Sequence, residues 1–135
     1  MAAIDAIVEC RLALEANAAK AREAWAEAKT AGADLIVFPE MFVTGYQLQD
    51  LVRKPAFAAD VARVVEKLAA DCADGPAIGI GGPWPGGDKP FNAYFILHGG
   101  KVQATVLKHH LPNYNVFDEK RYYHAGEMQG PVQIG

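Results

Sequence analysis

Cysteine is scarce in this 135-residue sequence, and the two cysteines, Cys10 and Cys72, lie in unrelated contexts. Neither belongs to a CxxC pair or to any other spacing typical of a metal site, so a cysteine-based metal centre is not expected. A reducing, cytoplasmic setting is the simplest interpretation of so few cysteines.

Several other features are missing, and each absence excludes a class of function. The formal net charge is -3 and the basic residues are scattered, which argues against nucleic-acid binding. The longest apolar runs, such as residues 35–38, are far shorter than the ~20 residues of a membrane span. The N-terminus carries Asp5 and Glu9 and no basic leader, so it does not resemble a signal peptide. The Gly-rich run 79–82 lacks the GxGxxG spacing and precedes a proline, which excludes a dinucleotide fingerprint.

What remains is the composition of one soluble globular domain, with 51% hydrophobic and 21% charged residues. Residues 14–30 predict an amphipathic helix whose apolar positions are three or four apart, and Gly32 is a natural stop after it. The members of this stripe are Ala18, Ala21, Trp25 and Ala28. Residues 56–71 predict a second helix, with one apolar side formed by Phe57, Val61, Val64, Val65 and Leu68.

Short apolar runs between and after these helices predict strands. The uninterrupted run 34–38 is typical of a strand buried on both faces, and 77–82 is a second, Gly-rich strand followed by a loop over 83–90. Residues 91–97 and 102–107 are two strands that a Gly-Gly link joins as a hairpin. Residues 131–135 resemble the start of another strand. The order predicts an α/β fold whose sheet looks unfinished, because parallel sheets need both faces covered.

Glu40 is the first candidate for chemistry, since it directly follows a predicted buried strand, at the sheet end where α/β folds place ligands. It lies among Phe38, Met41, Phe42 and Tyr46, and apolar surroundings disfavour the charged form of a carboxylate. Such a group is a candidate general acid or base. Spacing alone favours the alternative, a solvated loop glutamate.

Lys108 ends a predicted strand, where a fixed ammonium can stabilise a developing oxyanion. Its alternative is a lysine whose aliphatic stem lies over the strand end, which is the commoner case. Glu119 is a second acid eleven positions later. His109 and His110 do not predict a metal site, because neighbouring residues on a strand point to opposite faces.

Three aromatic residues lie in the predicted loops near these groups, namely Tyr46, Tyr114 and Phe117. They either line a pocket for a small ligand or cap the core. The residue types alone favour the core interpretation somewhat.

Two long motifs carry a family resemblance. GADLIVFPEMFVTGY, residues 32–46, and LKHHLPNYNVFDEKRYY, residues 107–123, resemble the first and second signatures of the nitrilase (carbon-nitrogen hydrolase) superfamily. The form LPNY-x-VFDEKRY is narrower and resembles the N-terminal glutaminase domain of glutamine-dependent NAD synthetases. The phrases at 49–51 and 91–93 fit that subfamily too, and the resemblance covers about residues 17–135.

The resemblance implies a partial nitrilase-type αββα sandwich, namely its front half, a mixed sheet with two helices on one face. It implies that Glu40 is the general base, that Lys108 steadies the tetrahedral oxyanion and that Glu119 is an auxiliary hydrogen-bonding glutamate. Tyr114 matches a tyrosine that contacts substrate glutamine, Tyr46 lies at the pocket entrance, and Phe117 is a further substrate-binding candidate. We expect Glu40 and Lys108 to converge, from neighbouring strand ends, on one hollow the size of a carboxamide.

The sequence departs from the family pattern at both ends. The nucleophilic cysteine of the family follows the segment after PVQIG, so residues 1–135 form a partial domain that we expect to be inactive alone. Neither Cys72 nor Cys10 is expected to substitute. At the start, residues 1–14 are an atypical leader without the family's first strand, and Ile4, Ile7 and Val8 recur at helical spacing, as in an extension of the first helix.

The resemblance also implies partners. Glutamine is the expected substrate, and a synthetase domain that uses ATP and Mg²⁺ follows C-terminally in the family, so no cofactor is expected in this segment. The complete family proteins form homo-oligomers. Two alternatives stay open: a fragment of another nitrilase-superfamily amidase, or a non-catalytic remnant that binds a partner through its aromatic pocket or its sheet edges.

Overall fold

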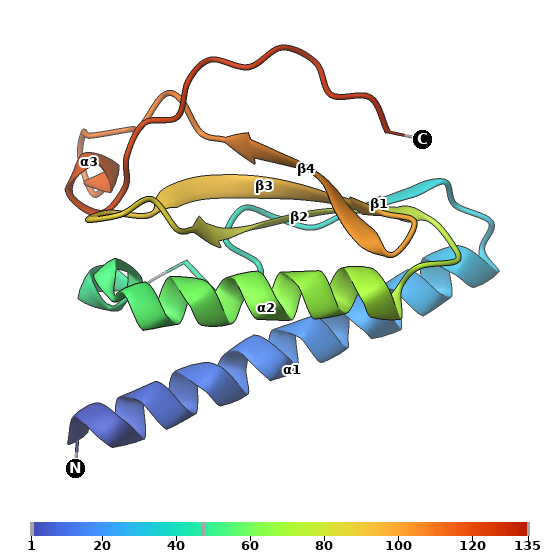
Figure 1. Ribbon diagram of the computed structural model, residues 1–135, viewed down its shortest axis with the longest axis horizontal. Helices are drawn as coiled ribbons and strands as arrows, with labels where there is room; N and C mark the ends of the chain where they lie inside the picture. The colour runs from blue at the N-terminus through green and yellow to red at the C-terminus, as the bar shows by residue number, and fades with distance from the viewer. Residues whose placement is uncertain (1, 47, 135) are drawn as a thin grey trace.

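Two helices and a four-stranded sheet form two layers in the computed structural model, which describes residues 2–46 and 48–134. For residues 2–12 and 49 the description covers the backbone alone. Figure 1 shows both long helices on the same side of the sheet. In chain order the elements are α1 (Ala2–Thr30), β1 (Leu35–Val37), the 3₁₀ helix η1 (Gln49–Arg53), α2 (Pro55–Asp71), β2 (Ala77–Trp84), β3 (Phe91–His98), β4 (Lys101–Leu107) and the short α3 (Glu119–Tyr122).

Helix α1 confirms the predicted apolar stripe and is longer than its periodic part, because the leader continues the same helix from Ala2. Ala18, Ala21 and Trp25 are buried, together with Leu14 one turn earlier. The indole Nε1 of Trp25 donates a buried hydrogen bond of 2.9 Å to the carbonyl of Pro76, which fastens α1 to the turn before β2. Within the residues that the structure describes, no helix combines the length and the apolar character needed to cross a membrane.

Helix α2 packs against both α1 and the sheet and provides the centre of the core. All five apolar residues predicted for its inner side are buried: Phe57, Val61, Val64, Val65 and Leu68. They pack with Ile78 and Ile80 of β2 and with Phe95 and Leu97 of β3 in one cluster. The apolar side of α2, which recurs every 3.6 residues, therefore packs on the alternate residues of the strands that face the helices. Burial of these side chains is the main favourable contribution to folding.

The strand order across the sheet is β1-β2-β3-β4. β1 and β2 are parallel, whereas β2–β3 and β3–β4 are antiparallel. The C-terminal ends of β1, β2 and β4 therefore lie at the same end of the sheet, where β3 begins. Gly99 and Gly100, both with positive φ (60° and 82°), close the β3–β4 hairpin, which confirms its prediction from the Gly-Gly link.

Two strand predictions are corrected. The first strand is not buried on both faces: β1 is an edge strand, Leu35 and Val37 are 42% and 65% exposed, and only Ile36 packs on the core. The reason is that the helices cover one face of the sheet, and alternate residues of β1 point to the other. Residues 131–134 form no strand, and Gln103 of β4 reaches them only through its side-chain amide, 3.1 Å from the carbonyl of Gln133.

Candidate functional site

The segment that carries Glu40 continues from β1 along the edge of β2 and then crosses it. The amide of Phe38 donates to the carbonyl of Gly79 over 2.7 Å, and the amide of Val43 donates to the carbonyl of Gly81 over 3.1 Å. A Cβ atom at Gly81 would lie 2.7 Å from the nitrogen of Met41 and 2.8 Å from Cα of Glu40. The backbone at Glu40 therefore passes β2 at a distance that only glycine permits.

A tight turn then aims the glutamate. Met41 has φ of 55°, an uncommon left-handed conformation for a residue with a side chain. The amide of Gly45 closes the turn with a 2.7 Å hydrogen bond to the carbonyl of Met41, and the buried Met41 side chain anchors it. Strained backbone of this kind is concentrated at functional sites in proteins.

Lys108 follows the last residue of β4 and remains bound to the sheet. Its amide donates to the carbonyl of Asn92 over 2.8 Å, and its own carbonyl accepts from the amide of Gly126 over 2.9 Å. The side chain thus leaves a well-fixed backbone at the end of the sheet where β1 and β2 also terminate.

The ammonium of Lys108 lies between two carboxylates. Its Nζ is 2.8 Å from Oε1 of Glu40 and 3.0 Å from Oε1 of Glu119. Glu119 is the first residue of α3 and is buried, with its side chain 8% exposed, whereas 38% of the Glu40 side chain is exposed. Lys108 thus contacts one glutamate 68 positions away in the sequence and another 11 positions away.

The two groups do not come from neighbouring strands, which corrects one expectation. Glu40 follows β1 and Lys108 follows β4, and these are the opposite edges of the sheet. They meet because the Glu40 segment crosses over Gly81 of β2 toward β3, while Lys108 is still paired with the first residues of β3.

Asn92 is a member of this cluster that the sequence did not reveal as a site residue. It lies near the start of β3, is 4% exposed, and its Nδ2 donates a 2.5 Å hydrogen bond to Oε1 of Glu40. The available signal was a single amide side chain within the apolar run 91–97, at the strand end nearest Lys108 in the predicted hairpin.

The electrostatics differ from the expectation for a carboxylate in apolar surroundings. Burial raises the pKa of Glu40, but hydrogen bonds from Lys108 and Asn92 together with the charge of Lys108 outweigh it, so that this pKa lies below its usual value. Burial lowers the pKa of Lys108, and its bonds to Glu40 and Glu119 more than compensate, so that this pKa is raised. At neutral pH the site therefore holds an ionised glutamate against a charged lysine.

A cavity of about 490 Å³ lies beside Asn92 and Glu119, whereas Lys108 borders a second hollow, so the expectation that Glu40 and Lys108 line one hollow together is not met. Tyr46 and Phe117 line the cavity together with Asn92 and Glu119, and the Tyr46 hydroxyl is 3.3 Å from Oε1 of Glu119. Burial, followed by the nearby charges of Glu40 and Glu119, raises the pKa of Tyr46, so the phenol stays protonated and donates this bond.

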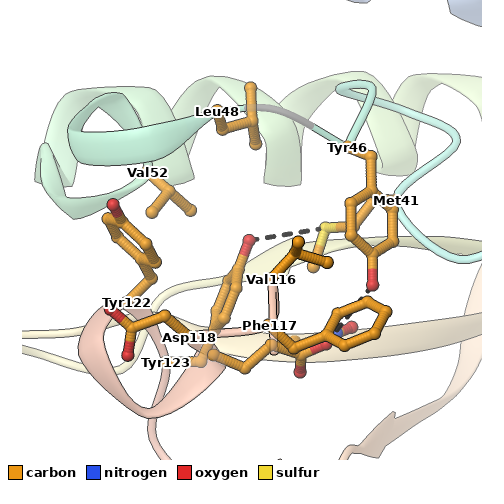
Figure 2. Close-up of a pocket in the computed structure, with 11 residues that line it drawn as sticks. Met41, Tyr46, Leu48, Val52, Val116, Phe117, Asp118, Tyr122 and Tyr123 are labelled. Carbon is orange, nitrogen blue, oxygen red and sulfur yellow. Dashed lines mark hydrogen bonds between the residues drawn. The ribbon is translucent and has the colours of Figure 1, made fainter. Parts of the chain in front are cut away.

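The rest of the cavity wall is largely apolar and aromatic. Figure 2 shows Tyr122 and Tyr123 of the α3 segment facing Leu48 and Val52 of the η1 segment across the hollow. The hydroxyl of Tyr123 reaches the sulfur of Met41 at 3.7 Å, so this wall is tied to the turn that aims Glu40. The cavity has the character of a small-ligand pocket, with largely apolar walls and a few polar groups.

Tyr114 is placed differently from the other two candidate aromatics. Its ring meets Phe117 edge-on, with the ring centres 5.8 Å apart, but 64% of the residue is exposed. It borders a second, more open hollow that Lys108, His109 and His110 also line. Among the described residues, no group of three or more His, Cys, Asp or Glu side chains is arranged to hold a metal ion.

The only cysteine whose side chain the structure describes lies away from this site. Cys72 caps the C-terminal end of α2 and precedes the start of β2. It therefore lies at the end of the sheet opposite to the end that carries Glu40 and Lys108. It is buried, and burial raises the pKa of its thiol, which makes the reactive thiolate scarce. Cys10 has a side chain outside the described part of the structure.

The geometry defines what the site can do. Two of the three ammonium hydrogens of Lys108 are directed to carboxylates, and a lysine can donate the third to an oxygen of a ligand. An ionised, partly exposed Glu40 beside it can accept a proton. A lysine held between two glutamates, one of which lines the cavity, suits the polarisation of a carbonyl group.

Comparison with known proteins identifies the family of the chain. The family model described as carbon-nitrogen hydrolase matches residues 6–134. The chain belongs to this family. A glutamine-dependent NAD(+) synthetase from Rhodobacter capsulatus is 51% identical over 123 residues, which is 91% of this chain and 22% of that protein.

Solved structures also resemble this one. The structure of glutamine-dependent NAD+ synthetase from Acinetobacter baumannii, in complex with ADP, aligns with a TM-score of 0.75 and 31% identity over 90% of this chain and 23% of that chain. An amidase variant from Nesterenkonia, of the nitrilase superfamily, aligns with a TM-score of 0.75 at 23% identity over 90% of this chain and 46% of that one, and supports the fold alone.

These comparisons confirm the predicted fold class and family. The four-stranded mixed sheet with two helices on one face corresponds to part of the nitrilase fold. The chain spans about a fifth of the length of the curated relatives that it matches.

Proposed function

We propose that this chain provides the acid, lysine and pocket of a glutamine-hydrolysing site, as part of the glutaminase domain of a glutamine-dependent NAD synthetase. The observation that carries the proposal is the ammonium of Lys108, held 2.8 Å from Glu40 and 3.0 Å from Glu119 beside a cavity. The identity to proteins named glutamine-dependent NAD(+) synthetases supports the substrate.

Each member of the cluster has a role in this proposal. Glu40 is the general base that deprotonates a thiol nucleophile and later returns the proton to departing ammonia. Its pKa below the usual value keeps it ionised and ready to accept a proton at neutral pH. Lys108 donates to the oxyanion of the tetrahedral intermediate, where a preorganised positive charge is most effective. Glu119 holds the lysine from the buried side.

The aromatic residues contact the substrate. Tyr46 and Phe117 line the cavity beside Glu119, and Tyr114 extends this aromatic group toward the open hollow over Lys108. The side chain of glutamine, a carboxamide on two methylene groups, suits a narrow apolar passage that ends at hydrogen-bonding groups.

An amide resists direct attack by water, so the reaction needs a covalent acyl intermediate on a nucleophile. Cys72 is unsuited, because it is buried at the opposite end of the sheet. We propose that the nucleophilic thiol comes from residues outside this chain. The exposed Leu35 and Val37 on the uncovered face of the sheet support a second layer there, as the other half of a sandwich.

In this proposal residues 1–135 are one partial domain, and residues 1–14 replace the usual first strand by helix. The ammonia passes to a C-terminal synthetase domain that uses ATP and Mg²⁺, in a cytoplasmic homo-oligomer, while this segment itself carries no cofactor. Another nitrilase-superfamily amidase and a non-catalytic remnant remain the competing candidates, and no contact among the described residues favours either.

A chimera tests the proposal directly. The matched segment of the Rhodobacter capsulatus synthetase is replaced by this chain, and NAD formation is measured with glutamine and, separately, with ammonia as nitrogen source. Glu40→Gln is expected to lower the glutamine-dependent rate by about 10²-fold or more and to leave the ammonia-dependent rate unchanged. Glu66→Gln, an exposed glutamate on α2, is the matched control.

Two outcomes would contradict the proposal. One is a chimera whose glutamine-dependent rate is the same with Glu40→Gln as with Glu66→Gln. The other comes from the 135-residue chain alone, which is expected to release no ammonia from glutamine. Release that Glu40→Gln abolishes would show that the chain already contains its nucleophile.

A further inference from the structure

Asn92 is bonded to both halves of the acid–lysine pair. Its side-chain Nδ2 donates to Oε1 of Glu40, and its backbone carbonyl accepts the amide of Lys108 at 2.8 Å. One residue of β3 thus contacts the segment after β1 and the segment after β4, which are the two edge strands of the sheet.

The alternation of β3 explains why the side chain reaches Glu40. Ala93 and Phe95 point into the core beneath the helices, so Asn92 and Tyr94 point to the opposite face. Tyr94 uses its hydroxyl to bind the carbonyl of Phe38 at 2.7 Å. Two successive residues on that face therefore hold the segment that carries Glu40. Tyr94 bonds to the backbone of this segment, and Asn92 bonds to the carboxylate of Glu40.

Burial makes this bond consequential. Asn92 is only 4% exposed, and it lines the cavity beside Glu119. An amide inside a protein costs free energy unless it is hydrogen-bonded, and here Oε1 of Glu40 receives its N–H. A neutral donor steadies the carboxylate without neutralising its charge, whereas a second cation would compete with Lys108.

We propose that Asn92 is a positioning residue of this site, which fixes the carboxylate of Glu40 with its side chain and Lys108 with its backbone, and so sets the distance between base and ammonium. Its relevance to amide hydrolysis rests on the proposed function, but the tether itself does not. Because Asn92 and Lys108 both donate to Oε1, neither bond occupies Oε2 of Glu40.

The carboxyl titration of Glu40, followed by ¹³C NMR in the 135-residue chain, tests the tether. The other titratable groups around Glu40, namely Lys108, Glu119, Tyr46 and Tyr123, are the same in every variant. In Asn92→Leu, which removes the donor at similar volume, the Glu40 midpoint is expected to shift upward, because one bond to the charged form is lost. In Asn92→Asp, two adjacent carboxyl groups are expected to titrate in two separated steps, the upper one above the wild-type midpoint.

Asn17→Leu is the matched control. The amide of Asn17 donates to the carbonyl of Val43, 3.1 Å away, so it holds the same segment without touching the carboxylate of Glu40. It is expected to leave the Glu40 midpoint in place. The near-isosteric Asn92→Asp decides the question if Asn92→Leu does not fold, which circular dichroism reveals.

An unchanged Glu40 midpoint in folded Asn92→Leu or Asn92→Asp would overturn the tether, and so would an equal shift in Asn17→Leu. The Rhodobacter capsulatus chimera separates the tether from the proposed function, because the proposed site needs residues outside this chain. Shifts of the Glu40 midpoint, together with a glutamine-dependent rate that Glu40→Gln does not lower, support the tether and contradict the function. A glutamine-dependent rate that Glu40→Gln lowers, together with an unmoved Glu40 midpoint, supports the function and contradicts the tether.

Discussion

Gly81→Ala is the substitution that most specifically tests how the Glu40 segment is held. The added Cβ would lie 2.7 Å from the backbone nitrogen of Met41 and 2.8 Å from Cα of Glu40, and ordinary contacts begin at 3.4 Å. The overlap is thus 3.4 − 2.7 = 0.7 Å, and it involves backbone atoms, which a change of side-chain rotamer cannot move away. The segment must move away from β2, and Glu40 must move with it.

Overpacking of this kind costs about 1–3 kcal/mol in a well-packed interior. The upper half of that range is expected here, because Met41 already has a left-handed φ and its turn has little freedom to adapt. The displacement should also lengthen the contact between Glu40 and Lys108, so the pKa of Glu40 should rise toward its ordinary value.

The assay is urea unfolding followed by circular dichroism, with the Glu40 titration as a local readout. Gly130→Ala is the matched control, since a Cβ there meets no atom within 4 Å and its backbone has no positive φ. It should change stability by less than about 0.5 kcal/mol. Equal stability of the two variants, together with an unmoved Glu40 midpoint, would refute the close crossing over β2.

Three further predictions concern the site and the core. Lys108→Met should destabilise the chain by about 2–3 kcal/mol at neutral pH, which is less than for a fully buried pair because Glu40 is partly exposed. This loss of stability should become smaller as the pH falls. Urea melts that show no loss would contradict the ion triad. The folded-state pKa of Glu40 is lowered, so its contribution to stability is present above its ordinary pKa of 4.5 and is lost as the pH falls through the folded pKa. The stability difference between wild type and Glu40→Gln should therefore be level at neutral pH and shrink below 4.5, and a difference that grows on acidification would show the opposite sign. Trp25→Phe should cost about 1–2 kcal/mol, because the buried carbonyl of Pro76 loses its donor; thermal melts measure this, and a variant as stable as wild type would show that the bond contributes little.

The helices and the hairpin could be predicted because their signals are local. The apolar residues of α2 recur with the helical period, and all five predicted inner residues are buried. The hairpin follows from Gly99 and Gly100, whose positive φ values few other residues adopt at low cost. Such features depend on a few neighbouring residues, and so a single sequence reveals them.

The predicted burial of β1 and the strand predicted to start at 131, which is absent from the described residues 131–134, were wrong for a different reason. An apolar run indicates that a strand tolerates burial, but layers from elsewhere decide whether both of its faces are covered. Val37 is 65% exposed because the helices cover only the other face. Residues 131–134 lie beside β4 without backbone ladder bonds, which local composition does not determine.

The site was predictable in its parts but not in its assembly. Glu40, Lys108 and Glu119 stood out through their motifs, and the structure brings them together. Asn92 and Gly81 were missed as members of the site, because their importance comes from contacts across 52 residues and from the crossing of one segment over a strand. Apolar surroundings suggested a raised pKa for Glu40, but the long-range bonds from Lys108 and Asn92 reverse that direction.

The shared ammonium of Lys108 is the centre of the whole account, and NMR can observe it directly. In a chain with ¹⁵N-labelled lysine and ¹³C-labelled glutamate, scalar coupling across hydrogen bonds should connect Nζ of Lys108 to the carboxyl carbons of both Glu40 and Glu119. A freely rotating Lys108 ammonium coupled to neither carboxylate would contradict the account.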